Sequence, residues 1–181
     1  VYKRQQLLYV DDVTTLELDL RGHGGSRADS LLSYDTLTPQ QRDRMPDDVV
    51  AAYQLLADSL GFDESRIAVV TEGNASGIVE KALFRGRIGA SVVHLSPLFV
   101  TTDRDLLNAI AFRADSPTLV AYSREDLEAM RGLKVFTETK ERTRLETRVY
   151  RDAGHGTELF RRDPKSLVDV QSWLLDQLAP R

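Results

Sequence analysis

The sequence of 181 residues has no cysteine, no long apolar run and no block of like charges. Without cysteine it can form neither disulfides nor thiolate metal sites, although this leaves the cellular compartment open. No apolar stretch reaches the length of about 20 residues that spans a membrane. The formal net charge is −4, with acids and bases interspersed, which argues against nucleic acid or an anionic membrane as the main partner.

Histidine is also scarce. The three histidines, His23, His94 and His155, have neither the i, i+4 spacing nor the paired acids of a metal site. His23 is expected to brace a glycine turn, and His94 fits a core histidine on an apolar strand. We therefore expect no metal and no cofactor.

The sequence composition is that of a globular protein with a sizeable core, since 41% of the residues are hydrophobic and 29% are charged. One domain is expected over residues 6–181. Residues Val1–Gln5 are what GTG TAT AAG AGA CAG encodes, which resembles a transposon end used in sequencing libraries. We expect a metagenomic reading frame with an adapter scar at residues 1–5; a genuine basic N-terminus is the alternative.

Short apolar strands alternate with amphipathic helices, which predicts an α/β fold with a doubly wound, mostly parallel sheet. The expected strands are 13–20, 66–71, 90–95, 118–122 and 147–150. The expected helices are 46–60, 74–84, 103–112, 127–139 and 164–178, and residues 21–46 are expected to be mainly polar loop. Pro164 falls in the first turn of the last helix, with Asp163 as its candidate cap.

Four segments carry more specific patterns. Leu18–Ser26 reads LDLRGHGGS, Gly61–Val70 reads GFDESRIAVV, Pro117–Asp126 reads PTLVAYSRED and Tyr150–Gly156 reads YRDAGHG. In this order they resemble the α/β-hydrolase superfamily, in particular its esterases, dienelactone hydrolases and serine aminopeptidases. The resemblance implies that the strand before Arg21 is the fourth of that fold. We therefore expect an N-terminally truncated domain that lacks its first strands; a natural miniature fold is the alternative.

The resemblance also implies where an acid and a base would lie. In chain order the family runs nucleophile, acid, histidine. By this match the base is His155 and the acid is Asp126, with Glu125 as the alternative acid. Asp126 could instead be only an N-terminal helix acid, and His155 could be a plain surface histidine.

The nucleophile position departs from the family. The elbow pattern G-x-S-x-G is here Thr71-Glu72-Gly73-Asn74-Ala75, so the serine position holds Gly73. Glycine has no side-chain oxygen, so no acyl-enzyme can form at this position. Glycine does suit the strained positive φ of such a turn.

Three neighbours could still take part in chemistry or binding. Ser76, in the first turn of the next helix, is a weak candidate nucleophile and is more typical of a surface or capping residue. Glu72 lies beside the apex rather than on it, which counts against it as a nucleophile, although both Glu72 and Asn74 are candidate binding residues. The backbone N–H of Asn74 could survive as an oxyanion donor.

Two functions follow from the sequence. The favoured one is a non-catalytic pseudo-hydrolase that binds a small acyl or ester ligand or a protein partner. The alternative is an active esterase or peptidase that uses a non-standard nucleophile or parts upstream of this sequence. A sequence error at the elbow is disfavoured because three codons would have to be wrong together.

Overall fold

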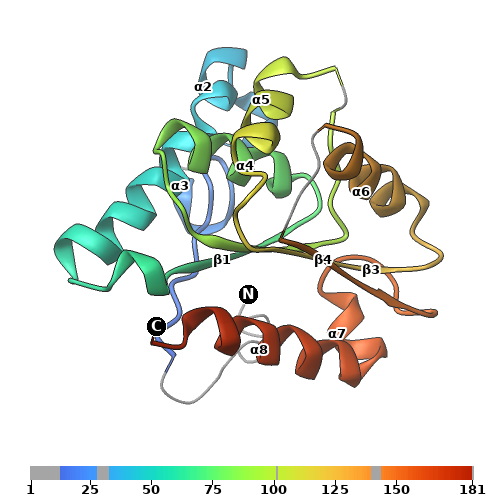
Figure 1. The fold of residues 1–181 in the computed structure, drawn as a ribbon. Helices are drawn as coiled ribbons and strands as arrows, with labels where there is room; N and C mark the ends of the chain where they lie inside the picture. Colours follow the sequence, from blue (N-terminus) through green and yellow to red (C-terminus); the bar gives the residue numbers. More distant parts are fainter. Residues whose placement is uncertain (1–12, 28–32, 101, 140–143, 181) are drawn as a thin grey trace.

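The computed structural model describes residues 13–27, 33–100, 102–139 and 144–180. Its centre is a parallel four-stranded sheet in the order β1-β2-β3-β4 (Figure 1). The strands are β1 (Ala68–Glu72), β2 (Ser91–Leu95), β3 (Thr118–Ser123) and β4 (Leu145–Tyr150). All four overlap strands expected from the sequence, and β4 begins two residues earlier than expected. The suspected adapter scar, Val1–Gln5, lies outside the described residues.

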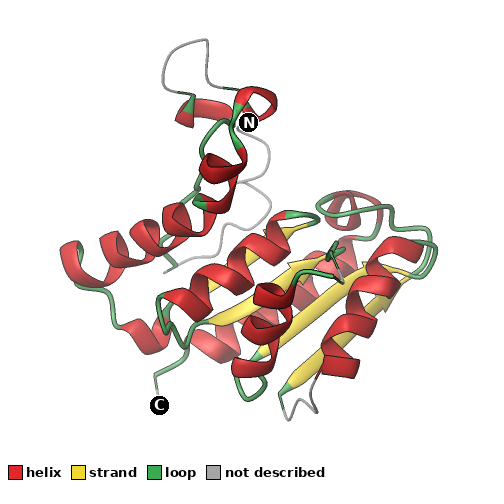
Figure 2. Ribbon diagram, turned by 90° about the horizontal axis from the view of Figure 1, so that it is seen from above, coloured by secondary structure: helices red, strands yellow, loops and turns green. Residues whose placement is uncertain are grey.

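Helices cover both faces of this sheet. Figures 1 and 2 show α3 to α6 on one face, and Figure 1 shows α7 and α8 on the other. The helices are α2 (Pro39–Asp43), α3 (Met45–Gln54), α4 (Ala75–Arg85), α5 (Arg104–Phe112), α6 (Leu127–Thr139), α7 (Glu158–Arg162) and α8 (Pro164–Leu178). Three 3₁₀ turns, η1 (Gly24–Ser26), η2 (Tyr34–Thr36) and η4 (Glu64–Arg66), and the π-helical η3 (Leu55–Ser59) complete the elements. The chain is an α/β protein.

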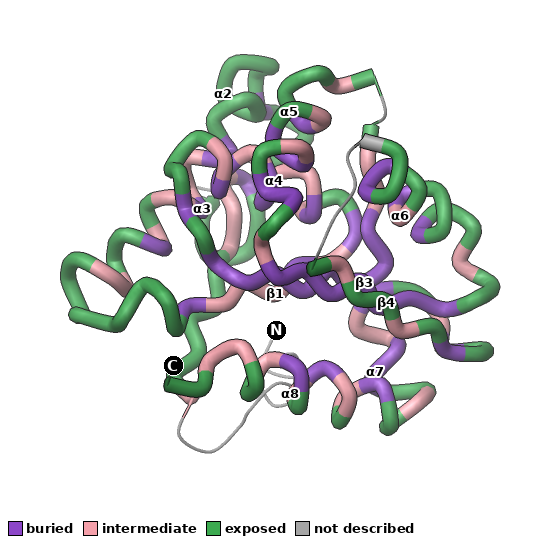
Figure 3. Tube along the Cα trace, viewed as in Figure 1, coloured by how far each residue is buried: buried purple, intermediate pink, exposed green. Residues whose placement is uncertain are grey.

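The two middle strands are buried on both faces (Figure 3). Because successive side chains of a strand point to opposite faces, Val93 and Leu119 pack in one cluster with Trp173 of α8. On the other face, Val92 joins a cluster with α3 and α4, and Val120 joins one with α5 and α6. Burial on both faces explains why β2 and β3 read as continuous apolar runs.

The expected strand over Val13–Leu20 is wrong. In the described part of the chain no strand pairs with this segment, and Leu16 and Leu18 are about two-fifths exposed. Alternation of apolar and polar residues predicts a half-buried strand only where a neighbour supplies the hydrogen bonds of a ladder. Leu20 nevertheless packs against the cluster of α3 and α4.

The expected polar loop before Pro46 is wrong in part, because it contains η2 and α2. Helix α2 begins with a capping box in which Thr38 Oγ1 accepts from the Gln41 N–H at 3.2 Å and Gln41 Oε1 accepts from the Thr38 N–H at 2.8 Å. Pro39 stands in the first turn, where its missing N–H costs nothing. The Thr-x-x-Gln pattern was a readable signal of this helix.

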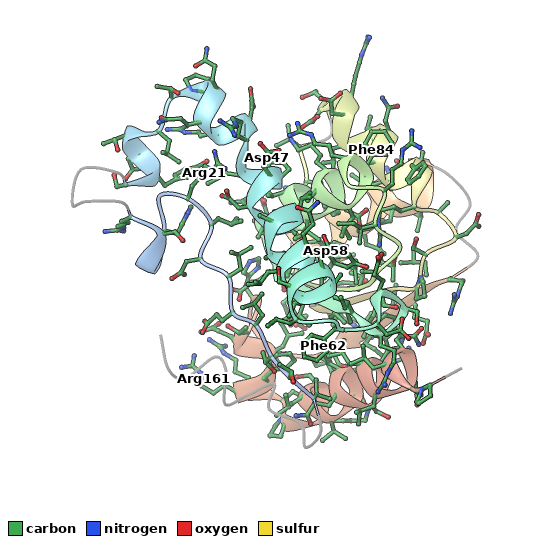
Figure 4. The ribbon with its side chains drawn as sticks, turned by 90° about the vertical axis from the view of Figure 1, so that its left-hand side faces the viewer. Arg21, Asp47, Asp58, Phe62, Phe84 and Arg161 are labelled. Atoms are coloured by element: carbon green, nitrogen blue, oxygen red, sulfur yellow. The ribbon has the colours of Figure 1, made fainter. Side chains whose placement is uncertain are left out.

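The glycine turn after Leu20 is tied to the start of α3. The guanidinium of Arg21 makes a bidentate ion pair with Asp48, and the Arg21 N–H also donates to this carboxylate at 3.0 Å. Figure 4 shows Arg21 near Asp47 at the start of α3, with Asp58 and Phe62 farther along the chain. His23 Nδ1 lies 3.1 Å from the Arg21 carbonyl oxygen, in line with its expected bracing role.

Three charged or ionisable side chains are fully buried together between the sheet and its helices. His94 Nε2 lies 2.9 Å from Glu80 Oε1, and Arg113 Nε lies 3.3 Å from Glu80 Oε2. Arg113 also donates to the carbonyl oxygens of Ile88 and Ala90 at 2.7 and 2.8 Å. Burial lowers the pKa of Arg113, against the opposing effect of Glu80. His94 is thus a core histidine with a carboxylate partner.

Candidate functional site

The tight turn between β1 and α4 places Gly73 at its apex. Gly73 has φ +55°, the left-handed region in which a residue without Cβ is little strained. Its N–H donates to the Leu95 carbonyl at 3.0 Å, and its own carbonyl accepts from the Leu98 N–H at 3.1 Å. The apex is therefore fixed against the carboxyl end of β2.

His155 faces this apex from the loop that follows β4. A Cβ built on Gly73 would lie 3.4 Å from His155 Nε2 and 3.9 Å from Leu98 Cδ1. The first distance is an ordinary van der Waals contact. The imidazole therefore points at the place that a nucleophile side chain on residue 73 would occupy.

Asp126 holds the other side of this ring. His155 Nδ1 lies 2.7 Å from Asp126 Oδ2. Since a carboxylate can only accept, Nδ1 is the donor, and in the neutral imidazole Nε2 carries the lone pair toward Gly73. The other oxygen, Oδ1, accepts from the Ala129 N–H at 3.0 Å at the start of α6. Asp126 thus contacts both the imidazole and the first turn of α6.

The pair is open to solvent on the imidazole side. The side chain of His155 is 44% exposed, whereas that of Asp126 is 9% exposed. Among the described residues, Asp126 is the one side chain hydrogen-bonded to this imidazole. The His155 ring is therefore partly accessible to solvent, whereas the carboxylate that it contacts is nearly covered.

The two residues beside Gly73 differ in their contacts. No acceptor in the described part of the chain pairs with the Asn74 N–H, which lies at the N-terminal end of the 11-residue helix α4. Glu72 packs against Gly156, where a Cβ would overlap its carboxylate. Glu72 is thus directed to the histidine loop.

The candidate nucleophile Ser76 is not a surface residue, contrary to expectation. It is fully buried, and its hydroxyl has no hydrogen-bond partner among the described residues. A buried hydroxyl without a contact to His155 is not placed to attack an incoming ester.

Two serines next to this site were not predicted from the sequence. Ser96 directly follows β2 and accepts from the Gly156 N–H at 2.9 Å, and Ser123 ends β3 and accepts from the Ala153 N–H at 3.1 Å. Glu125, the alternative acid, bonds Ser123 and the Asp152 N–H and makes no hydrogen bond to His155. Polar residues at the carboxyl ends of adjacent parallel strands were the available signal.

Comparison with known proteins finds no matching family model and no curated protein with a significant sequence match. Solved structures do match. Arabidopsis thaliana SOBER1 superposes with a TM-score of 0.59 at 13% identity, over 79% of this chain and 67% of that one. An alpha-beta serine hydrolase homologue from Coxiella burnetii gives 0.57 at 15% identity, over 89% and 67%. The fold is that of the α/β hydrolases.

Within an α/β-hydrolase fold, loops at the carboxyl ends of the strands are where ligands bind. Gly73, Asp126 and His155 follow β1, β3 and β4 at that edge. Among the described residues no group of three His, Asp or Glu side chains is arranged to hold a metal. No described helix is both long and apolar enough to cross a membrane.

Proposed function

We propose that this protein is a non-catalytic α/β-hydrolase-fold protein that binds a small acyl-type ligand at the surface formed by Gly73, Asn74 and His155. The observation that carries the proposal is the 3.4 Å separation between His155 Nε2 and the position of a Cβ on Gly73. An acid–base pair is aimed at a nucleophile position that has no oxygen. Without that oxygen no acyl-enzyme can form there.

The same groups can hold an acyl carbonyl. The unpaired Asn74 N–H can donate to a carbonyl oxygen, and the N-terminal end of α4 favours the negative end of that dipole. The bare apex of Gly73 lets the carbonyl carbon approach the backbone closely. His155 Nε2 is then free to accept from a ligand N–H or O–H.

A second candidate function is hydrolysis by water. The intact 2.7 Å contact between Asp126 and His155 favours it, because this contact orients the imidazole as a general base. Nε2 would remove a proton from a water molecule, and the hydroxide would add to the ester carbonyl. The imidazolium would then return the proton to the departing alcohol, with no covalent intermediate on the protein.

One set of variants tests both candidates. Hydrolysis of p-nitrophenyl butyrate is measured for the unaltered protein, Gly73→Ser, Gly73→Ala and His155→Ala. Binding of butyranilide, an amide that resists hydrolysis, is followed through the NMR signals of Asn74 and His155. The proposal expects binding without turnover in the unaltered protein and in Gly73→Ala, and turnover only in Gly73→Ser.

The outcomes are distinct. Turnover by the unaltered protein that disappears in His155→Ala establishes the water mechanism and overturns the non-catalytic proposal. Turnover that appears in Gly73→Ser and is absent from Gly73→Ser/His155→Ala supports a dormant acid–base pair. Absence of butyranilide binding together with absence of turnover rejects an acyl ligand.

A further inference from the structure

The loop that carries His155 is tied down on both sides of the histidine by buried serines. On the C-terminal side, the Gly156 N–H donates to Ser96 Oγ at 2.9 Å. Ser96 is fully buried, and its own N–H donates to the Ala121 carbonyl at 2.9 Å. This tie anchors the loop to the carboxyl ends of β2 and β3.

On the N-terminal side, the tie runs through two residues. The Ala153 N–H donates to Ser123 Oγ at 3.1 Å, and that hydroxyl donates to Glu125 Oε2 at 2.6 Å. The same carboxylate oxygen accepts from the Asp152 N–H at 2.9 Å. Ser123 is 1% exposed, so its hydroxyl has no water to replace a lost partner.

The path of the loop needs such ties. Asp152, Gly154 and Gly156 all have positive φ, at 49°, 79° and 59°. For Asp152 this conformation is costly, because a residue with a Cβ avoids the left-handed region. The side chain of His155 is 44% exposed, so packing around its ring is incomplete.

We propose that Ser96 and Ser123 are positioning residues of the candidate site, which set the direction of the His155 ring through the backbone of residues 152–156. Neither serine hydroxyl is hydrogen-bonded to the imidazole among the described residues, and neither serine lies within 4 Å of a Cβ built on Gly73. They act on the peptide groups before and after the histidine, so that Nδ1 meets Asp126 while Nε2 faces the apex. The inference rests on the site of the proposed function and requires no ligand.

The test compares Ser96→Ala and Ser123→Ala with Ser166→Ala in the full chain. Ser166 is the matched control, since it is fully buried and its hydroxyl donates to the Asp163 carbonyl at 2.7 Å at the start of α8. NMR follows the Nδ1 proton of His155 and the nitrogen shifts of its ring. Amide exchange of Gly156 and Ala153 reports whether each tie is broken.

We expect Gly156 exchange to rise roughly tenfold in Ser96→Ala and Ala153 exchange to rise similarly in Ser123→Ala. In both variants the exchange of the His155 Nδ1 proton with water should also rise by at least roughly tenfold. The imidazole should then no longer be held in a single tautomer. Ser166→Ala should leave all of these signals in place.

Two further variants separate the hydroxyl from other effects. Ser96→Gly removes the hydroxyl but suits the φ of +48° at this position, so it should behave like Ser96→Ala. Ser123→Thr keeps a hydroxyl and should restore the Nδ1 signal. These two variants also carry the test if an alanine variant does not fold.

Two results overturn the inference. The first is that amide exchange shows the serine hydrogen bonds to be lost in both alanine variants, while the His155 Nδ1 signal and the tautomer stay unchanged. The other is an equal loss in Ser166→Ala, which would mean general loosening of the fold. Failure to bind butyranilide would count against the proposed function and would leave these signals unaffected.

Discussion

Gly132 of α6 lies so close to Pro97 that a Cβ on the glycine would approach the Pro97 carbonyl oxygen well inside 3.0 Å, a separation that real Cβ contacts essentially never show. Replacing a glycine by alanine inside a helix ordinarily stabilises it by about 1 kcal/mol. We expect the opposite for Gly132→Ala, a loss of about 1–3 kcal/mol, because a backbone oxygen must move. Urea denaturation measures this change.

Gly77 of α4 provides the matched control. Its nearest neighbour to an added Cβ is Leu106 Cδ2 at 3.6 Å, an ordinary contact. Gly77→Ala should therefore stabilise the protein by about 0.5–1 kcal/mol. If both variants shift stability in the same direction, the close packing of α6 on the segment after β2 is not as described.

The buried group of Glu80, His94 and Arg113 gives a second prediction. Glu80→Gln leaves the charge of Arg113 without its carboxylate in a site that water does not reach. Removal of one partner from a buried ion pair costs about 3–5 kcal/mol. Glu138→Gln is the control, since its pair with Lys134 is more than half exposed and should cost less than about 0.5 kcal/mol. Equal losses in the two variants would contradict this account.

Most of the sheet could be predicted because each of its strands is marked by a pattern within its own few residues. Hydrophobic side chains fall on both faces of the strand in the run Arg66–Thr71 and in the sequences of β2 and β3. Such runs are typical of strands in a parallel sheet that helices cover on both faces. The buried group of Glu80, His94 and Arg113 could not be predicted, since its members lie far apart in the sequence. Val13–Leu20 shows the opposite case. Its apolar and polar residues alternate as in a strand, but no described strand lies beside it to form the hydrogen bonds of a sheet.

A third prediction concerns the apex glycine. Gly73→Ala should destabilise the protein by about 1 kcal/mol, because alanine at φ +55° enters the left-handed region. Gly61→Ala is the control, with φ +72° and open space around the added Cβ. We expect similar losses for both, since the His155 contact at 3.4 Å is not a clash. A much larger loss at residue 73 would show that this position no longer accommodates a side chain.

A fourth prediction concerns Glu125. Hydrogen bonds from Ser123 and from the Asp152 N–H hold the pKa of Glu125 below its usual 4.5. Since this carboxyl pKa is depressed on folding, its stabilising effect is complete above 4.5 and is lost as the pH falls through the depressed value. Ser123→Ala should raise the pKa of Glu125 toward 4.5, as measured by a carboxyl-carbon NMR titration.

Asp63 is the internal reference for that titration. Its pKa is also lowered, chiefly by a hydrogen bond from Ser65. Ser123→Ala should leave the Asp63 titration unchanged. If the pKa of Glu125 stays low in Ser123→Ala, the Ser123 hydrogen bond is not what lowers it.

Some residues of the candidate site could be proposed from the sequence, whereas the contacts of others are seen only in the structure. Gly73, Asp126 and His155 could be proposed because each follows a recognisable pattern at the end of a strand. Ser96 and Ser123 also stand at strand ends, but nothing in the sequence links their hydroxyls to the backbone N–H groups of Gly156 and Ala153. Glu125 and Asp126 are adjacent and chemically alike, and only the geometry assigns one to the loop backbone and the other to the imidazole.

Asp126 uses one carboxylate oxygen for the imidazole and the other for the first turn of α6. An acceptor at residue 126 stabilises the start of that helix with or without chemistry at the apex. The presence of this acid is therefore not by itself evidence of catalysis. Asp126→Ala would remove both contacts at once, so the orientation of the His155 ring has to be measured separately from the stability of α6.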